Sequence, residues 1–210
     1  MKRINIIGES CTDIYQYGEV KRINPEYPSM IFNAKTEIIE YGMAYNVFQH
    51  LTDFKEIFAN HLEIKLYSNS PREIIKRRCI EKNYNTTLIR IDSDNLYTTF
   101  NYEELEIFDC DCIVISDYNK GYLSEMTLKH ILEESKRRNI ITFLDTKKEL
   151  GDWCKDASFI KINQHEREKS KDFIHENLIV TLSSEGCTFK DVNYKTTPVK
   201  AVDVSGAGDV

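Results

Sequence analysis

Two glycines and an aspartate near the end of the sequence have the spacing of an anion-binding turn. The stretch is Ser-Gly-Ala-Gly-Asp, residues 205–209. Glycines at positions 206 and 208 let backbone N–H groups turn toward an anion, and a helix that begins there would add its positive end. Asp209 would then face the anion and could accept a proton from an attacking hydroxyl. The motif alone is weak, because a turn that leads into a helix uses the same residue types.

Five polar clusters elsewhere in the sequence each follow a short apolar run. Such runs are typical of buried strands, and in an open α/β sheet ligands bind beyond the carboxyl ends of the strands. Five clusters that converge on one edge of a sheet indicate a site. The clusters are residues 9–13, 117–121, 145–148, 163–166 and 183–186.

The elements that must position these clusters alternate between strand and helix in the second half of the chain. Residues 112–117 are one of several short apolar runs that predict buried parallel strands. Residues 124–139 predict a helix with an apolar stripe, capped by Ser124. Residues 72–81 and 86–92 predict a β-hairpin. We therefore predict an α/β fold, with a mostly parallel sheet covered by helices on both faces and a small extra β element.

Composition excludes several classes of protein. The 210 residues are 41% hydrophobic and 30% charged, which is typical of one ordinary globular domain. The formal net charge of −6 argues against a nucleic-acid partner, and no apolar run approaches the roughly 18 residues of a membrane span. The six cysteines contain no C-x-x-C pair, and no signal peptide is evident, so we expect reduced thiols in a cytoplasmic protein.

Two standard nucleotide-binding motifs are absent. The sequence has no G-x-x-x-x-G-K-[ST], which excludes a P-loop protein. The first apolar run ends on Gly8 alone rather than on G-x-G-x-x-G, which argues against a dinucleotide-binding fold. The terminal glycines remain the candidate for holding a phosphate.

Seven segments, taken in order, resemble the ribokinase-like (PfkB) family of carbohydrate kinases. SDYNKGYL is very similar to the S-D-Y-x-K-G-x-L of the heptose-7-phosphate kinases of lipopolysaccharide-core biosynthesis, and VDVSGAGDV matches the D-x-[ST]-G-A-G-D signature of the whole family. The resemblance implies a ribokinase-like three-layer sandwich, a single domain whose β lid comes from about 14–41 and 74–92. The other five segments are GESCTDIYQYGEVKRINPEYP, YGMAYNV, LDTKK, KINQHE and TLSSEGC.

The resemblance also implies roles for residues at the sugar and at the transferring phosphate. Asp209 would be the catalytic base, and Gly206, Ala207 and Gly208 would supply the anion hole. The sugar hydroxyls would be bound by two polar side chains, beside a glycine that permits close approach, and the substrate's own phosphate by two cations. The substrate-binding residues implied are Asp13, Asn46, Gly42, Arg22 and Lys120.

A second set of residues would bind ATP. Asn163 and Glu166 would organise Mg²⁺ through its waters. The nucleotide-binding residues implied are Asn163, Gln164, His165, Glu166, Ser183, Glu185 and Gly186. Some of these positions also fit purely structural roles: Asn163 with Glu166 has the spacing of a helix cap, Asp13 could be a cap, and Lys120 could be an exposed turn lysine.

The sequence departs from the family pattern in three places. Tyr41 replaces the first of a usual glycine pair, with bulky residues at 43 and 45. The stretches 47–71 and 167–176 are short. A helix that started at Gly206 would have five residues at most, so the chain is expected to stop where the catalytic helix should begin.

Two functions are therefore expected from different classes. One is ATP-dependent phosphorylation of a sugar or sugar phosphate, most closely a heptose 7-phosphate. The alternative is a non-catalytic remnant of such a kinase that binds sugar phosphate or a partner subunit. Pairing of two lid edges into a homodimer is a further expectation from the family, with neither nucleic acid nor membrane as partner.

Overall fold

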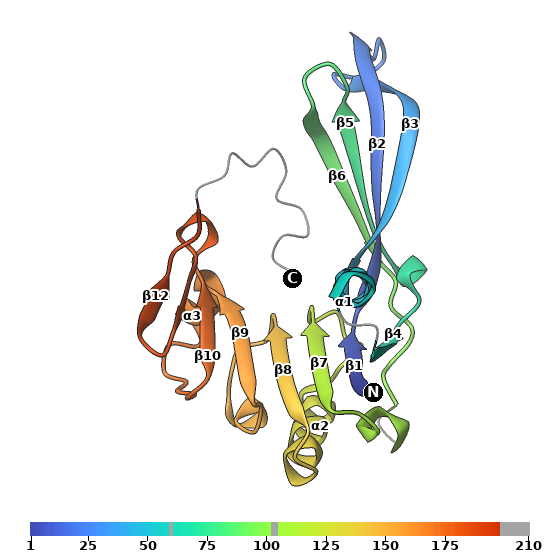
Figure 1. The fold of residues 1–210 in the computed structure, drawn as a ribbon. Helices are drawn as coiled ribbons and strands as arrows, with labels where there is room; N and C mark the ends of the chain where they lie inside the picture. Colours follow the sequence, from blue (N-terminus) through green and yellow to red (C-terminus); the bar gives the residue numbers. More distant parts are fainter. Residues whose placement is uncertain (59–60, 102–104, 198–210) are drawn as a thin grey trace.

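Two β-sheets form the frame of the molecule, one mainly parallel and the other projecting from its edge (Figure 1). The computed structural model describes residues 1–58, 61–101 and 105–197. The predicted α/β class is confirmed, with helices on both faces of the main sheet.

The main sheet has the order β12-β11-β10-β9-β8-β7-β1-β4 among the described residues. From β4 to β10 all neighbours are parallel, and β11 and β12 continue the sheet antiparallel. The strands are β1 (Lys2–Gly8), β4 (Leu62–Ser68), β7 (Cys112–Asp117), β8 (Ile141–Thr146), β9 (Phe159–Asn163), β10 (Leu178–Thr181), β11 (Cys187–Phe189) and β12 (Val192–Tyr194). Because parallel strands share one carboxyl edge, all the loops that follow them emerge on the same side.

The second sheet has the order β3-β2-β5-β6 and rises beyond that carboxyl edge (Figure 1). Its strands are β2 (Ser10–Ile23), β3 (Met30–Met43), β5 (Ile74–Glu81) and β6 (Thr86–Asp94). A single residue, Glu9, separates the end of β1 from the start of β2, so the chain runs from one sheet directly into the other. The predicted hairpin is confirmed, since β5 and β6 pair antiparallel.

Three α-helices and four short 3₁₀ turns connect the described strands. They are α1 (Ala44–Phe58), α2 (Glu125–Arg137), α3 (Gln164–Lys169), η1 (Pro71–Glu73), η2 (Leu105–Phe108), η3 (Asp152–Cys154) and η4 (Ser183–Glu185). Helix α2 begins as predicted: the Oγ of Ser124 accepts a hydrogen bond from the N–H of Thr127 at 3.0 Å. Its stripe of Leu128, Ile131 and Leu132 is fully buried in the main core.

The two faces of the main sheet are covered unequally. Helix α2 seals one face, against residues such as Ile113 and Leu144. On the other face α1 contacts β4, β1 and β7, while Ile141 and Phe143 of β8 remain 50% and 41% exposed. The sequence predicted full cover on both faces, because the strands read as wholly apolar. In the described part of the chain, only the face against α2 is fully covered.

Candidate functional site

The five polar clusters do follow the carboxyl ends of strands of the main sheet, as the sequence predicted, although residues 10–13 of the first cluster already belong to β2 of the second sheet. They follow β1, β7, β8, β9 and β10, which are parallel neighbours in the sheet. The chain reaches β4 on one side of β1 and later β7 on the other. This reversal of strand order makes the end of β1 a topological switch point, where ligands of open α/β sheets bind.

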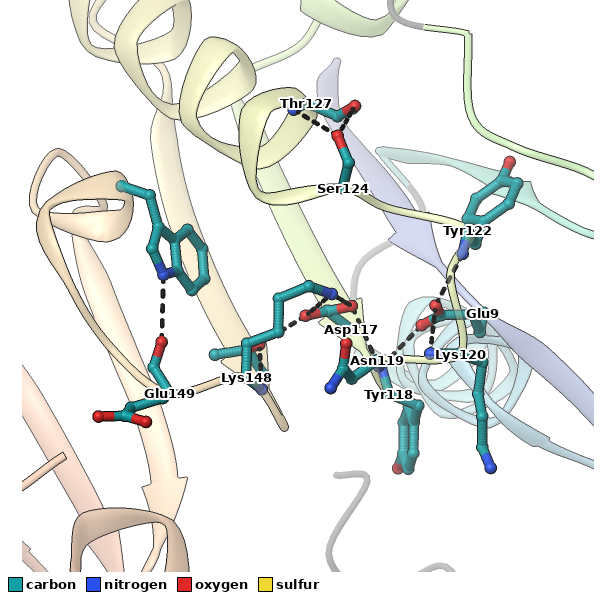
Figure 2. A network of polar contacts seen from close by, with 12 residues as sticks. Glu9, Asp117, Tyr118, Asn119, Lys120, Tyr122, Ser124, Thr127, Lys148 and Glu149 are labelled. Atoms are coloured by element: carbon teal, nitrogen blue, oxygen red, sulfur yellow. Dashed lines mark hydrogen bonds and ion pairs between the residues drawn. The ribbon is translucent and has the colours of Figure 1, made fainter. Parts of the chain in front are cut away.

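Glu9 lies at the switch point and organises the loop that follows β7, as Figure 2 shows. Its carboxylate accepts three backbone N–H groups: those of Tyr118 at 2.7 Å, Lys120 at 3.1 Å and Tyr122 at 3.2 Å. Glu9 is completely buried. Burial, followed by the nearby charge of Asp117, raises the pKa of Glu9 to about 7, although the backbone hydrogen bonds act in the opposite direction.

Beside Glu9, a buried ion pair ties the end of β7 to the end of β8. The ammonium of Lys148 lies 2.7 Å and 2.9 Å from the two carboxylate oxygens of Asp117 (Figure 2). The hydroxyl of Thr146 donates to the same carboxylate at 2.5 Å. Asp117 is 1% exposed. A buried carboxylate needs this full set of partners, because an unpaired buried charge is strongly destabilising.

Asp13 lies near the base of the second sheet and is paired with Arg78 of β5 at 2.5 Å. The thiol of Cys11 also donates to Asp13, at 3.3 Å. Gly42 of β3 pairs in register with Cys11. A Cβ at position 42 would lie 2.4 Å from a carboxylate oxygen of Asp13, so the carboxylate holds this position only beside a glycine.

The other three predicted substrate-binding residues lie in different places. Asn46 is in the first turn of α1 and lines a groove of about 640 Å³ between β3 and α1. Lys120 pairs with Asp94 at the end of β6, at 2.5 Å, and so joins the loop after β7 to the second sheet. Arg22 is nine residues along β2 from Asp13, roughly 30 Å at the rise of a strand, so the two are not brought together.

Two of the bulky residues that depart from the family pattern line the same groove as Asn46. The rings of Tyr41 and Tyr45 lie 4.8 Å apart, centroid to centroid, and both face this groove. The bulk at these positions therefore builds the wall between β3 and α1.

Four of the predicted nucleotide-binding residues line one shallow pocket after β9 and β10. Its volume is about 420 Å³. Gly186 lies next to it with φ +98°, and a Cβ there would lie 1.9 Å from the carbonyl oxygen of Tyr194. Glu185 belongs to η4, directly before this glycine. The pocket is lined by Asn163, Gln164, His165, Glu168, Thr181, Leu182 and Ser183.

Asn163 and Glu166 form the cap of helix α3, which is the alternative that the spacing had left open. Each side chain accepts from the other's backbone N–H, at 2.8 Å and 2.9 Å. Glu166 also accepts from the amide of Asn163 at 2.9 Å and pairs with Lys147 at 2.8 Å.

These contacts argue against a directly bound metal. Both carboxylate oxygens of Glu166 are occupied, and an ammonium already neutralises them. Elsewhere in the described ranges, no group of three or more His, Cys, Asp or Glu could hold a metal ion. Glu166 is therefore not available for direct coordination of Mg²⁺, and a role of Asn163 and Glu166 through water stays a prediction.

Several residues that the structure brings together had no individual role assigned from the sequence. Glu9, Asp117 and Lys148 lay within the polar clusters, but nothing in the sequence shows that they meet. The ring of Tyr118 is flanked by Lys76 at 5.6 Å and Lys147 at 5.5 Å, measured from ammonium to ring centroid. Gly206, Ala207, Gly208 and Asp209 lie outside the described residues.

The fold matches solved ribokinase-like carbohydrate kinases. Ribokinase from Thermotoga maritima aligns with a TM-score of 0.64 at 18% identity, covering 100% of this chain and 83% of that one. Arabidopsis thaliana ribokinase, solved with ribose and ATP, aligns at 0.66 and 14% identity, with the same coverage. The chain therefore has the ribokinase-like fold.

The comparison of sequences identifies a narrower group of relatives than the comparison of structures does. The bifunctional protein HldE of Helicobacter pylori strain J99 is 26% identical over 260 residues, which covers 100% of this chain and 56% of that protein. The bifunctional protein HldE of Campylobacter jejuni strain NCTC 11168 is 27% identical, with 99% and 54% covered. The chain thus spans about half the length of these relatives, and the predicted resemblance is confirmed.

No protein-family model matches. None of the described helices is long and apolar enough to cross a membrane.

Proposed function

We propose that the chain belongs to a sugar kinase that transfers the γ-phosphate of ATP to a hydroxyl of a sugar phosphate, with heptose 7-phosphate as the best candidate. The observation that supports the proposal is the pocket at the carboxyl ends of β9 and β10, which is lined by four of the predicted nucleotide-binding residues, Asn163, Gln164, His165 and Ser183. Asp13 beside Gly42, at the base of the second sheet, is the proposed sugar-binding group. The likeness to HldE proteins supports the choice of a heptose.

The proposed roles follow the resemblance. Asp209 takes the proton from the attacking hydroxyl, and the N–H groups of 206–208 stabilise the charge that develops on the transferred group. Asp13 and Asn46 bind sugar hydroxyls. The pocket after β9 and β10 takes the nucleotide.

The second sheet is proposed to act as a lid. It rises beyond the carboxyl edge of the main sheet on the side of β1, where a bound sugar would lie (Figure 1). A cover over the sugar would exclude water, so that ATP is not simply hydrolysed. Its outer strands β3 and β6 carry exposed Ile39 and Ile91, and pairing of two such edges would give the expected homodimer.

The test is transfer of labelled γ-phosphate from magnesium-ATP to heptose 7-phosphate by the 210-residue chain. We expect product with the wild-type chain and with Asp172→Asn, which alters an exposed aspartate away from the site. Asp209→Asn should reduce the rate by at least about 10³-fold, as loss of a catalytic base does. Retention of the wild-type rate by Asp209→Asn would exclude that residue as the base.

A second candidate is a chain that binds sugar phosphate without transferring phosphate to it. The observation in its favour concerns Glu166, which was expected to organise Mg²⁺ through water. Its carboxylate is already used in the cap of α3 and in an ion pair with Lys147. Thermal unfolding distinguishes the two, because a ligand that binds the folded state raises the melting temperature. Shifts with both heptose 7-phosphate and ATP support the kinase. A shift with the sugar phosphate alone supports the binding protein.

A further inference from the structure

The loop after β7, residues 118–122, donates three of its backbone N–H groups to one buried side chain from a distant part of the sequence. The carboxylate of Glu9 receives the N–H groups of Tyr118, Lys120 and Tyr122, which lie 109, 111 and 113 residues away (Figure 2). Without this acceptor, three backbone donors beside the core would lose their partner. Glu9 is therefore the anchor of this loop.

The same loop also contacts the second sheet. The ammonium of Lys120 meets Asp94 of β6, and the ring of Tyr118 lies 5.6 Å from the ammonium of Lys76 on β5. Tyr118 also packs against the small cluster of Cys11, Met43 and Ile74 at the base of the second sheet. The loop thus makes contacts in two directions: its backbone N–H groups bind Glu9 on the inside, and two of its side chains contact the second sheet on the outside.

We propose that Glu9 is a positioning residue, which sets the second sheet over the sugar-phosphate site through the contacts that Tyr118 and Lys120 make with that sheet. The proposal rests on the proposed function for the identity of the ligand. Glu9 itself does not need to touch the ligand, because it is completely buried beneath the loop. Its carboxylate also faces Asp117 and Lys148, which hold each other through their own ion pair.

Glu9→Gln is the test substitution, because it keeps the shape of the side chain and replaces one acceptor oxygen with an NH₂ donor. At least one of the three N–H groups then faces a donor instead of an acceptor. By amide exchange in NMR, we expect protection of the amides of 118, 120 and 122 to fall about tenfold. The amide of Lys147 is an internal control, since it lies outside the loop and donates to the backbone carbonyl of Asp117 at 2.9 Å. Its protection should stay within about twofold.

Ligand affinity separates positioning from a merely structural role. For Glu9→Gln we expect the Kd of heptose 7-phosphate to rise about tenfold, while the Kd of ATP stays within about twofold, because the nucleotide pocket follows β9 and β10. In an Asp94→Ala background, which removes the Lys120–Asp94 pair but keeps Lys120, the same change should weaken sugar-phosphate binding only about threefold, because one of the two contacts through which Glu9 acts has been removed. Glu133→Gln, on the exposed side of α2, is the control for loss of a carboxylate.

Each result decides one part of the inference. Unchanged protection at 118, 120 and 122 overturns the anchoring role of Glu9. Lost protection with unchanged sugar-phosphate affinity overturns its positioning role. A wild-type chain that binds no heptose 7-phosphate overturns the proposed function and with it the ligand part of this inference, whereas the amides still decide whether Glu9 holds the loop. If Glu9→Gln does not fold, Asp94→Ala alone remains decisive: unchanged sugar-phosphate affinity there overturns the route through Lys120.

Discussion

At position 42 the absence of a side chain fixes where the carboxylate of Asp13 lies. A Cβ would come within 2.4 Å of Asp13 and 2.9 Å of the sulfur of Cys11. Cys11 is fully buried, and Asp13 is paired with Arg78, so neither side chain is free to turn away. Gly42→Ala must therefore break the Asp13–Arg78 pair or shift β3. We expect it to lower the free energy of unfolding in urea by about 1–3 kcal/mol.

Gly151→Ala is the matched control for that substitution. A Cβ at 151 would lie 3.6 Å from the indole ring of Trp153, an ordinary contact, and the backbone there is extended. It should change the free energy of unfolding by no more than about 0.5 kcal/mol. Equal stability of the two variants would mean that the close approach at Gly42 carries no energetic weight.

Glu9 also predicts how stability depends on pH. Burial raises its pKa to about 7 in the folded chain, above the ordinary value of 4.5. The folded state therefore binds this proton more tightly than the unfolded state, and between about pH 4.5 and 7 the contribution of Glu9 to stability falls as pH rises.

The measurement is urea unfolding of the wild-type chain and of Glu9→Gln at several pH values. Because glutamine does not titrate, the stability of the wild-type chain relative to the variant should fall by on the order of 3 kcal/mol across this range and then level off. A relative stability that does not change with pH would show that the pKa of Glu9 is not raised.

The residues of the site divide by how far apart their partners are in the sequence. The positions of Asp13 and Asn163 near the ends of strands could be predicted, because each lies close to an apolar run that had to be a strand, while their roles in binding stay predictions. Glu9 could not be assigned a role, since the N–H groups that it accepts begin 109 residues later. Arg22 stands close to Asp13 in the sequence, but a single extended strand carries it away.

Among the helices and strands, α2 offers the clearest test of a prediction made from neighbouring residues alone, namely that Ser124 caps the helix. The hydroxyl of Ser124 accepts the N–H of Thr127, which is the bond that the cap residue is selected to make. Ser124→Ala should lower the free energy of unfolding by about 1 kcal/mol. Ser70→Ala is the control, because Ser70 precedes η1 without a side-chain cap bond, and it should be nearly neutral. If both variants lose the same stability, the cap of α2 is not the cause.

The strands show which sequence signals determine an element. Runs such as 112–117 were predicted because they pass through the sheet with both faces largely buried, so apolar residues are required throughout. Strand β4 was missed, although Leu62, Ile64 and Leu66 alternate with Glu63 and Lys65. This alternation is typical of an edge strand with one wetter side. The three-residue strands β11 and β12 are too short for any periodic signal.

At the scale of the whole molecule, the unequal cover of the main sheet is the main departure from the expected fold. The face opposite α2 is hollowed by a cavity of about 640 Å³ between α1 and strands β7 to β10. Its walls are almost wholly apolar, from Leu51 and Phe54 of α1 to Phe143, Phe159 and Ile179 of the strands. The stacked rings of Phe143 and Phe159, 5.0 Å apart, form its floor.

An apolar cavity of this size should bind a small apolar probe in the 210-residue chain, because contiguous exposed apolar surface is rare on folded domains and attracts such ligands. We expect anilinonaphthalene sulfonate to fluoresce with the folded wild-type chain. Phe143→Asp should reduce the emission by at least about half, since it places a charge on the cavity floor. Tyr84→Asp is the control, because Tyr84 is 82% exposed in the turn between β5 and β6, and it should leave the emission unchanged. Equal emission from the wild-type chain and Phe143→Asp would mean that the dye does not bind in this cavity.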